Sequence, residues 1–278
     1  MSINILIVDG NDQKNSDILK TIGMKTQYEE YSYALNKIAP SKLNIQVIHP
    51  AVKEDFLPSN INLDDFQGIA WTGSSLNIYD INPSITRQIE LAKLLLTKKN
   101  LIFGSCWGLQ VLTTAAGGIV DKNTKGLEAV IAKNIKLNNK GSFHKMYLNK
   151  PRIFDAFCWH YDEVKSVPSN STILAFNDHS FIQALSFKIH RSEFWGVQYH
   201  PEFTPKWMIG LMKMRKQVLL ENEIYSSEDK YNQIIQALLD ISKSKNISSE
   251  ININKSIIKQ KIHYLELKNW LKYLENSL

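Results

Sequence analysis

The chain lacks the long apolar stretches that would anchor it in a membrane. Its longest apolar runs include residues 5–8 and 94–96, which are far shorter than the ~20 residues needed to cross a bilayer. A strand-like segment begins almost at the N-terminus, which does not fit the layout of a signal peptide. We therefore expect no membrane association.

Motifs for cofactors and metals are also missing. The sequence has no Gly-x-x-x-x-Gly-Lys-Ser/Thr loop for nucleotide phosphates and no Gly-x-Gly-x-x-Gly turn for dinucleotides. The 7 histidines and 2 cysteines do not cluster at the spacing of metal ligands. The sequence therefore predicts neither a metal site nor a cofactor.

Charge of one sign is in only slight excess. Lysine and arginine number 33 against 27 acidic residues, a net charge of +6, and the lysines are spread among asparagine and isoleucine. A nucleic-acid-binding surface would gather them in one patch, so we expect no nucleic-acid partner. A hydrophobic content of 44% over 278 residues fits one large globular domain with an appendage.

Glycine is scarce, with 12 in the chain, yet two glycines flank a cysteine in the segment Gly-Ser-Cys-Trp-Gly-Leu-Gln, residues 104–110. A strand-like run precedes this segment and a helix-compatible run follows, which places Cys106 at the apex of a sharp strand-to-helix turn. Gly104 and Gly108 leave room for strained backbone and for a substrate. The helix start beside the sulfur would favour the thiolate. Cys106 is therefore a candidate nucleophile.

A candidate base and its orienting acid lie in a second segment, Gly-Val-Gln-Tyr-His-Pro-Glu-Phe, residues 196–203. His200 could take the thiol proton, and Glu202 could accept the other imidazole N–H and fix the tautomer. With Cys106 these are the minimal parts for acyl transfer through a thioester. Because a disulfide would block this nucleophile, we expect Cys106 and Cys158 to be free thiols in a reducing cytoplasm.

The two segments together resemble class I (triad-type) glutamine amidotransferases. Residues 104–110 resemble that family's nucleophile elbow, and residues 196–203 resemble its His-Pro-Glu segment, in the same order and at the same separation. The glutaminase domain of GMP synthase and its free-standing relatives look most similar. The resemblance covers roughly residues 1–220 and implies an enzyme that hydrolyses the side-chain amide of glutamine without a cofactor.

The resemblance also implies an oxyanion hole and part of a substrate site. The backbone N–H of Trp107 follows the nucleophile and would supply one donor. Gly73 would supply the other, from the turn at residues 71–76, although the family's turn is usually richer in glycine and contains proline. Gln110 matches a family glutamine beside the substrate, and Glu128 matches a further position near the pocket.

The segment Trp-His-Tyr-Asp-Glu-Val, residues 159–164, resembles the family segment that lines the glutamine pocket, usually Ser-His-Gly-Asp. His160 and Asp162 match that pattern, and Tyr161 lies between them as a further substrate-binding candidate. Trp159 and Tyr161 replace small residues. They could narrow the pocket, favour a substrate other than free glutamine, or pack in the core.

The order of expected elements predicts an α/β fold with a mostly parallel, doubly wound sheet, the flavodoxin-like amidotransferase fold. Apolar runs predict strands at residues 3–8, 44–48, 66–71 and 100–103, and helical spacing predicts helices at residues 17–22, 28–38, 85–96 and 109–116. A smaller antiparallel part and a closing helix are expected at residues 129–137, 172–176, 181–187, 193–199 and 204–220.

The chain divides into an amidotransferase domain, residues 1–222, and a helical C-terminal extension, residues 223–278. The extension begins with a helix start at Ser227, followed by a polar stretch at residues 242–250. Its last helix carries a stripe at near-heptad spacing, made of Ile257, Tyr264, Leu267, Leu271 and Leu274. These helices could pack on their own domain, or they could dock a synthetase subunit or a second copy of the chain.

Two enzymatic functions fit these residues. In the first, a stand-alone subunit hydrolyses glutamine and hands ammonia to a separate synthetase, because the chain has no pyrophosphatase-type Ser-Gly-Gly-x-Asp-Ser loop of its own. In the alternative, an autonomous hydrolase or peptidase cleaves γ-glutamyl amides. A non-catalytic binding module is a third possibility, and the intact set of Cys106, His200 and Glu202 argues against it.

Overall fold

A computed structural model describes residues 2–54, 56–80, 82–244 and 253–277. Its centre is a nine-stranded sheet with the order β2-β1-β3-β4-β11-β10-β9-β6-β7. The strands in the parallel half are β2 (Leu43–Ile48), β1 (Ile3–Val8), β3 (Gly68–Trp71), β4 (Leu101–Ser105) and β11 (Ser192–Val197). The antiparallel half contains β10 (Ala184–Ile189), β9 (Thr172–Phe176), β6 (Glu128–Leu137) and β7 (Ile153–His160). This mixed sheet confirms the predicted fold class.

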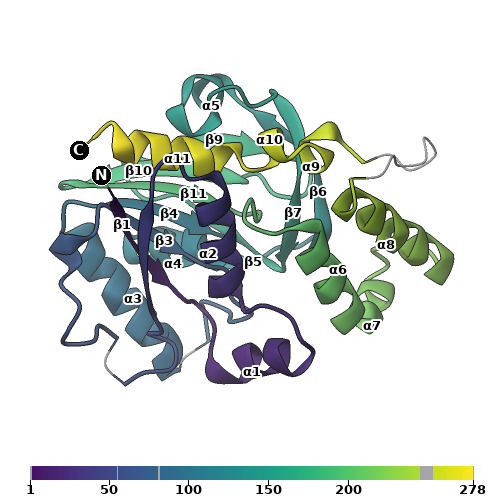
Figure 1. Ribbon diagram of the computed structural model, residues 1–278, viewed down its shortest axis with the longest axis horizontal. Helices are drawn as coiled ribbons and strands as arrows, with labels where there is room; N and C mark the ends of the chain where they lie inside the picture. Colours follow the sequence, from purple (N-terminus) through teal and green to yellow (C-terminus); the bar gives the residue numbers. More distant parts are fainter. Residues whose placement is uncertain (1, 55, 81, 245–252, 278) are drawn as a thin grey trace.

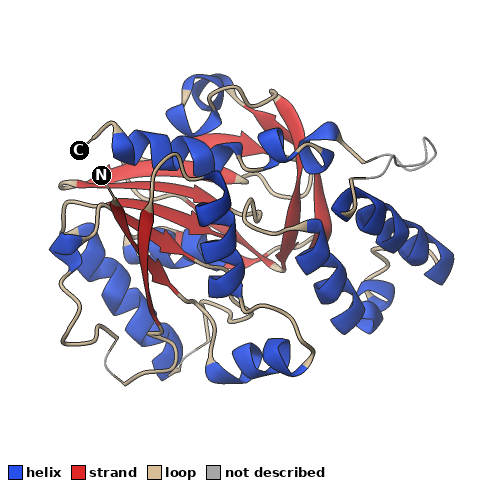
Figure 2. Cartoon of the chain, viewed as in Figure 1, coloured by secondary structure: helices blue, strands red, loops and turns tan. Residues whose placement is uncertain are grey.

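Helices cover both faces of the sheet (Figures 1 and 2). On one face lie α2 (Gln27–Ile38) and α11 (Leu265–Glu275), and on the other lie α3 (Pro83–Leu96) and α4 (Trp107–Ala115). Strand β1 is almost continuously apolar because it is buried on both faces. Ile5 and Ile7 belong to the buried cluster under α2 and α11, whereas Leu6 and Val8 belong to the cluster under α3 and α4, because successive side chains point to opposite faces.

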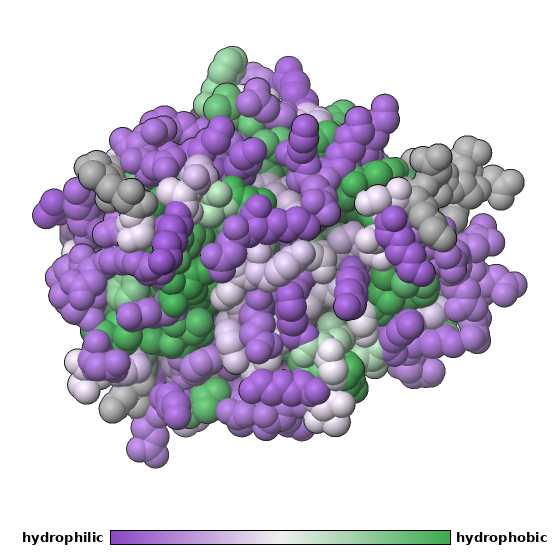
Figure 3. All heavy atoms as spheres, in the orientation of Figure 1, coloured by the Kyte–Doolittle hydropathy of each residue, from purple (hydrophilic) through white to green (hydrophobic). Residues whose placement is uncertain are grey.

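The remaining helices lie around these layers. They are α1 (Gln13–Thr21), α5 (Asn139–Phe143), α6 (Pro205–Met214), α7 (Lys216–Glu221), α8 (Glu228–Ser242), α9 (Lys255–Ile258) and α10 (Gln260–His263), with the 3-10 turns η1 (Leu63–Asp65) and η2 (Lys145–Tyr147). Polar side chains cover most of the face seen in Figure 3, with apolar patches between them. Among the described helices, none has the length and apolar character that a membrane crossing needs.

Several expected boundaries differ from the structure. The single helix expected at residues 204–220 is divided into α6 and α7 at Arg215, whose backbone leaves the helical region. The strands β5 (Ile119–Lys122), β7 and β8 (Asp162–Ser166) were not predicted. β5 and β8 pair only with each other and carry charged residues, so neither shows the apolar run that identifies a buried strand.

The C-terminal extension packs against the chain itself. Helix α8 begins after Ser227, as predicted, but the expected last helix is divided into α9, α10 and α11. Most of the predicted polar stretch lies outside the described residues. The near-heptad stripe is buried in the same hydrophobic clusters as the rest of the fold; its members are Ile257, Tyr264, Leu267, Leu271 and Leu274. That stripe is therefore a packing surface within the chain, and the division at residue 222 remains a prediction.

Candidate active site

The ends of three neighbouring parallel strands form the site. Gly104 of β4 pairs with Trp71 of β3 on one side and with Gly196 of β11 on the other. Because parallel strands end at the same edge of a sheet, the residues that follow these strands meet there. Cys106 follows β4, His200 follows β11, and the Gly73 turn follows β3. The structure thus brings together three groups that are far apart in the sequence.

The turn at Cys106 is as sharp as the sequence predicts. Cys106 has a φ of 51° and a ψ of −100°, a conformation that is strained for a residue with a side chain. Its N–H donates to the carbonyl of Val197 at 2.8 Å. A Cβ atom on Gly104 would lie 2.6 Å from the backbone of Gly108, and one on Gly108 would lie 2.7 Å from the Trp71 carbonyl oxygen. Both glycines are therefore required by close backbone packing.

The Cys106 thiol is only 3% exposed. Its Sγ atom lies 3.7 Å from the Trp159 carbonyl oxygen and accepts a hydrogen bond from Gln198 Nε2 at 3.5 Å. Burial, together with the charges of Glu202 and Asp162, raises the pKa of Cys106. Burial thus acts against the thiolate that the helix start is expected to favour. The thiol needs a base to remove its proton.

His200 and Glu202 form a buried pair. The Nδ1 atom of His200 lies 2.7 Å from Glu202 Oε1, and Glu202 Oε2 accepts a hydrogen bond from Ser105 Oγ at 2.9 Å. Since a carboxylate only accepts, Nδ1 carries a hydrogen, and Nε2 is the ring atom that would act as the base. The ring of Phe203 lies flat against the imidazole at 3.8 Å with an interplanar angle of 4°.

Of the two expected oxyanion donors, Gly73 lies beside the His200 imidazole and Trp107 lies beside the Cys106 sulfur. A Cβ atom on Gly73 would come within 2.5 Å of His200 Cε1 and 2.7 Å of Gln27 Oε1, so only glycine fits beside the imidazole. The backbone N–H of Trp107 lies against the sulfur and partly opposes the rise in the pKa of Cys106. Their role as oxyanion donors remains a prediction.

A cavity of about 640 Å³ is lined by Cys106. The four expected substrate-binding residues also line it, namely Gln110, His160, Tyr161 and Asp162. Trp159 also lines it, and Tyr161 is 41% exposed. These two aromatic residues therefore shape the cavity. Gln110 Nε2 lies 3.4 Å from both the Asp162 carbonyl oxygen and Gln198 Oε1.

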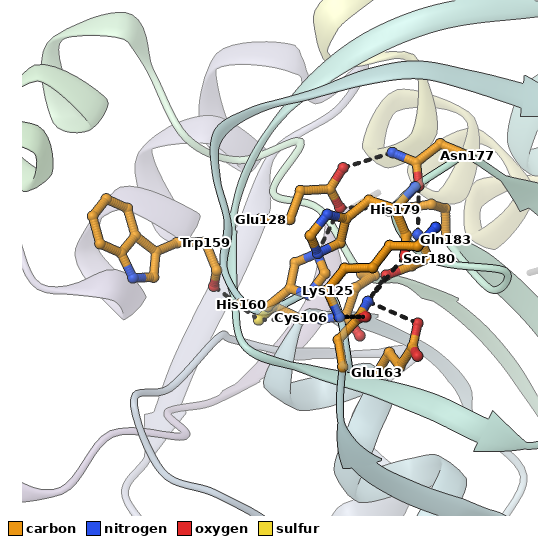
Figure 4. A network of polar contacts seen from close by, with 12 residues as sticks. Cys106, Lys125, Glu128, Trp159, His160, Glu163, Asn177, His179, Ser180 and Gln183 are labelled. Carbon is orange, nitrogen blue, oxygen red and sulfur yellow. Dashed lines mark hydrogen bonds and ion pairs between the residues drawn. The ribbon is translucent and has the colours of Figure 1, made fainter. Parts of the chain in front are cut away.

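His160 is already held by protein groups on both sides of its ring. Its Nε2 atom lies 2.9 Å from Glu128 Oε2, and its Nδ1 atom lies 3.0 Å from the Asp162 carbonyl oxygen. Glu128 also accepts hydrogen bonds from Asn177 and Gln183, at 2.6 and 2.7 Å (Figure 4). His160 therefore fixes the backbone beside the cavity, while the Trp159 side chain points away from this network.

Sequence reasoning missed two supports of the site. Gln198 links Gln110 to the Cys106 sulfur, and Tyr31 OH lies 3.2 Å from Ser105 Oγ, which holds Glu202. The position of Gln198, two residues before His200, could have indicated a place in the site. Its contact with Cys106 depends on the pairing of β11 with β4, which the sequence alone does not give.

Comparisons with known proteins agree with this geometry. Residues 33–212 match the family glutamine amidotransferase class-I. The chain is 31% identical to a gamma-glutamyl-L-1-hydroxyisopropylamide hydrolase from Pseudomonas sp., across 98% of this chain and 93% of that protein. It is 32% identical to the glutamine-hydrolyzing GMP synthase subunit of Methanococcus vannielii, across 43% of this chain and 60% of that protein.

A glutamine amidotransferase from Thermotoga maritima has the same fold, with a TM-score of 0.65 and 14% identity, covering 98% of this chain and 97% of that one. The chain belongs to the class I glutamine amidotransferase family. It is accordingly a hydrolytic enzyme, and the family implies glutamine or another γ-glutamyl amide as its substrate. The family predicted from residues 104–110 and 196–203 is confirmed.

Proposed function

We propose that this chain acts alone as a γ-glutamyl amide hydrolase that releases glutamate and a small amine. The observation that carries this proposal is the full-length similarity to the Pseudomonas hydrolase, which covers 98% of this chain, C-terminal helices included. The similarity to the Methanococcus GMP synthase subunit covers only 43% of the chain. The similarity to an amine-releasing hydrolase therefore extends over more of the chain than the similarity to an ammonia-supplying subunit does.

The first half of the reaction forms a thioester. His200 Nε2 takes the proton from the Cys106 thiol as the sulfur attacks the γ-carbonyl carbon of the substrate. The backbone N–H groups of Trp107 and Gly73 stabilise the oxyanion of the tetrahedral intermediate. The imidazolium, paired with Glu202 at 2.7 Å, then donates its proton to the amide nitrogen. The C–N bond breaks and the amine leaves.

The second half releases glutamate. Water, deprotonated by His200, attacks the thioester carbon, and the C–S bond breaks. The sulfur regains a proton from the imidazolium, so the resting thiol is restored. In the main cavity, Asp162 offers a carboxylate to the substrate's α-ammonium group, and Arg215 offers a guanidinium to its α-carboxylate; both side chains line that cavity.

A second, smaller cavity of about 80 Å³ lies beside His200 and supports a leaving group larger than ammonia. The departing nitrogen must be next to the imidazole that protonates it, so its substituent would enter this cavity. Apolar side chains form much of the wall, including Phe203, Trp207, Leu211 and Met214. Gln27 also lines it, and its buried Oε1 has no hydrogen-bond partner among the described residues. A small alkylamine bearing one hydroxyl donor suits this lining.

Amine release by the purified chain alone tests the proposed function. The substrates are glutamine, γ-glutamyl isopropylamide, γ-glutamyl-L-1-hydroxyisopropylamide and γ-glutamylalanine. We expect the highest kcat/KM for the small alkylamides, and for the hydroxylated one above the plain one, with no added protein. Slow cleavage of glutamine alone, with the other amides untouched, would contradict an alkylamide hydrolase.

The similarity to the Methanococcus GMP synthase subunit favours a second candidate, a glutaminase that supplies ammonia to a synthetase. Such subunits are gated to avoid wasting glutamine, so their activity rises when the synthetase binds. Glutaminase activity that stays low alone and increases when a synthetase is added would support this candidate over the hydrolase.

A further inference from the structure

The C-terminal helices hold both ends of the segment that carries His200 and Glu202. Just before this pair, Tyr199 OH donates to Glu266 Oε1 of α11 at 2.7 Å. Just after it, the carbonyl oxygen of Phe203 lies 2.8 Å from His263 Nε2, at the end of α10. The candidate base and its orienting acid thus lie between two contacts with residues near the end of the chain.

Glu266 is fully buried, and all of its described partners are buried with it. Its Oε2 atom lies 2.8 Å from Lys150 Nζ, and Lys150 also donates to the Ile262 carbonyl oxygen at 2.9 Å. Tyr147 OH lies 2.8 Å from Tyr199 OH. A buried carboxylate is costly unless it is paired and hydrogen-bonded. The arrangement fixes one orientation of Tyr199, the residue before His200.

His263 fixes the other end of the segment. Its ring is buried, and burial lowers the pKa of His263 to about 3, so the imidazole is neutral near pH 7. Since the Phe203 carbonyl only accepts, the ring hydrogen is on Nε2. The side chain of Phe203 stacks on the His200 imidazole at 3.8 Å and on Trp207 at 3.8 Å. A shift of the Phe203 backbone would therefore move the surface on which the candidate base rests.

We propose that α10 and α11 position the His200–Glu202 pair, and that His263 and Glu266 are positioning residues, an inference that rests on the proposed function for its kinetic test. Proton transfer between Cys106 and His200 requires the imidazole to be held at hydrogen-bonding distance and angle. In this proposal, α10 and α11 support catalysis through their contacts with Tyr199 and Phe203, and they do not touch the substrate.

The kinetic test compares His263→Leu, which removes the donor to Phe203, with His263→Gln, whose amide N–H can take its place. Tyr199→Phe removes the donor to Glu266 with little change in volume and serves as the milder variant. Tyr273→Ala is the control, because Tyr273 is also on α11 but stacks on Trp195 and bonds Glu193 at the other end of β11. We expect the Tyr273→Ala substitution to lower stability while leaving the contacts of residues 199–203 unchanged.

We expect His263→Leu to lower kcat by about 100-fold with little change in KM, since small displacements of a catalytic group have effects of that size. His263→Gln should recover most of the loss, and Tyr199→Phe should show a smaller loss of kcat. Tyr273→Ala should keep kcat despite a lower Tm. Losses of kcat that follow Tm equally in all four variants would overturn the inference.

A substrate-free readout separates this inference from the proposed function. The His200 Nδ1–H, bonded to Glu202 at 2.7 Å, should give a strongly downfield proton resonance in a nitrogen-edited NMR spectrum. We expect that resonance to shift or broaden in His263→Leu and to stay in Tyr273→Ala. An unchanged resonance in His263→Leu would overturn the positioning role. A wild-type chain that turns over no γ-glutamyl amide would overturn the proposed function and leave this test intact.

Discussion

At the scale of single residues, the site favours the protonated, weakly reactive form of its candidate nucleophile, Cys106. Burial raises the pKa of Cys106, and the charges of Glu202 and Asp162 raise it further. The thiolate is the reactive species, so a raised pKa lowers reactivity toward general electrophiles. In the proposed reaction, His200 removes this proton as the sulfur attacks the substrate.

Alkylation by iodoacetamide checks this state. An ordinary thiol is half ionised near pH 8.5, so its labelling rate begins to level off above that pH. Because the pKa of Cys106 is raised, we expect Cys106 to be labelled slowly up to pH 9, with a rate that is still rising at that pH. Intact mass against time at several pH values gives the rate, and a small cysteine peptide provides the reference. A rate that reaches a plateau below pH 8 would show that the resting site holds a thiolate.

Also at the residue scale, we expect Trp159 to limit the size of the leaving group. It lines both the main cavity at Cys106 and the small cavity at His200, so replacing its indole with a small side chain should join them. We expect Trp159→Ser to raise kcat/KM for γ-glutamyl anilide relative to γ-glutamyl isopropylamide, by about 10-fold. Specificity differences of a few kcal/mol at most are typical of apolar pockets. An unchanged ratio would mean that Trp159 does not border the leaving group.

At the scale of elements, local sequence patterns predicted the strands that position the site and missed several others. The strands β1, β3, β4 and β11 are buried and strongly apolar, which is why periodicity identifies them. Cys106 and His200 follow from motifs attached to two of these strands. Gln198 and the Tyr31–Ser105 contact depend on which strands and helices become neighbours, and no local pattern encodes that.

The extension was the least predictable element, because its apolar stripe fits either a partner or the chain itself. The structure buries that stripe: Trp270 and Leu271 are inaccessible and share one cluster with Phe103 of β4. A Cβ atom on Gly68 would come within 2.9 Å of the Trp270 ring. The sheet face and α11 therefore fit one another closely.

We accordingly expect residues 1–222 alone to fold poorly. Removing the later helices would expose the apolar surface under Trp270 and leave Lys150 without Glu266. Replacing Trp270 alone by alanine should cost about 3–5 kcal/mol of unfolding free energy. Denaturant melts and dye binding measure both effects. A fragment 1–222 with the Tm of the whole chain would show that the extension is an independent appendage.

At the scale of the whole molecule, stability should fall at mildly acidic pH. Burial lowers the pKa of His263 to about 3 and that of His144 to about 4, whereas both ionise near 6.5 when unfolded. The unfolded chain therefore binds more protons below pH 6.5, and stability decreases as the pH falls from 6.5 toward 4.

Each of these histidines contributes a slope of at most about 1.4 kcal/mol per pH unit in that window. Denaturant melts at pH 7, 6 and 5 measure the slope, and His263→Gln should reduce it. A stability that is constant or increases from pH 6.5 to 5 would contradict the neutral state of both rings.

The central claim is that this chain alone cleaves a γ-glutamyl amide through a thioester on Cys106, and rapid-quench mass spectrometry tests it most directly. The wild-type chain and Cys106→Ala are mixed with γ-glutamyl-L-1-hydroxyisopropylamide, with no other protein present, and are quenched in acid. We predict amine release with one γ-glutamyl group on the Cys106 peptide of the wild type, and neither in the variant. Amine release by Cys106→Ala at the wild-type rate, or no adduct and no release from the wild type, would contradict the account.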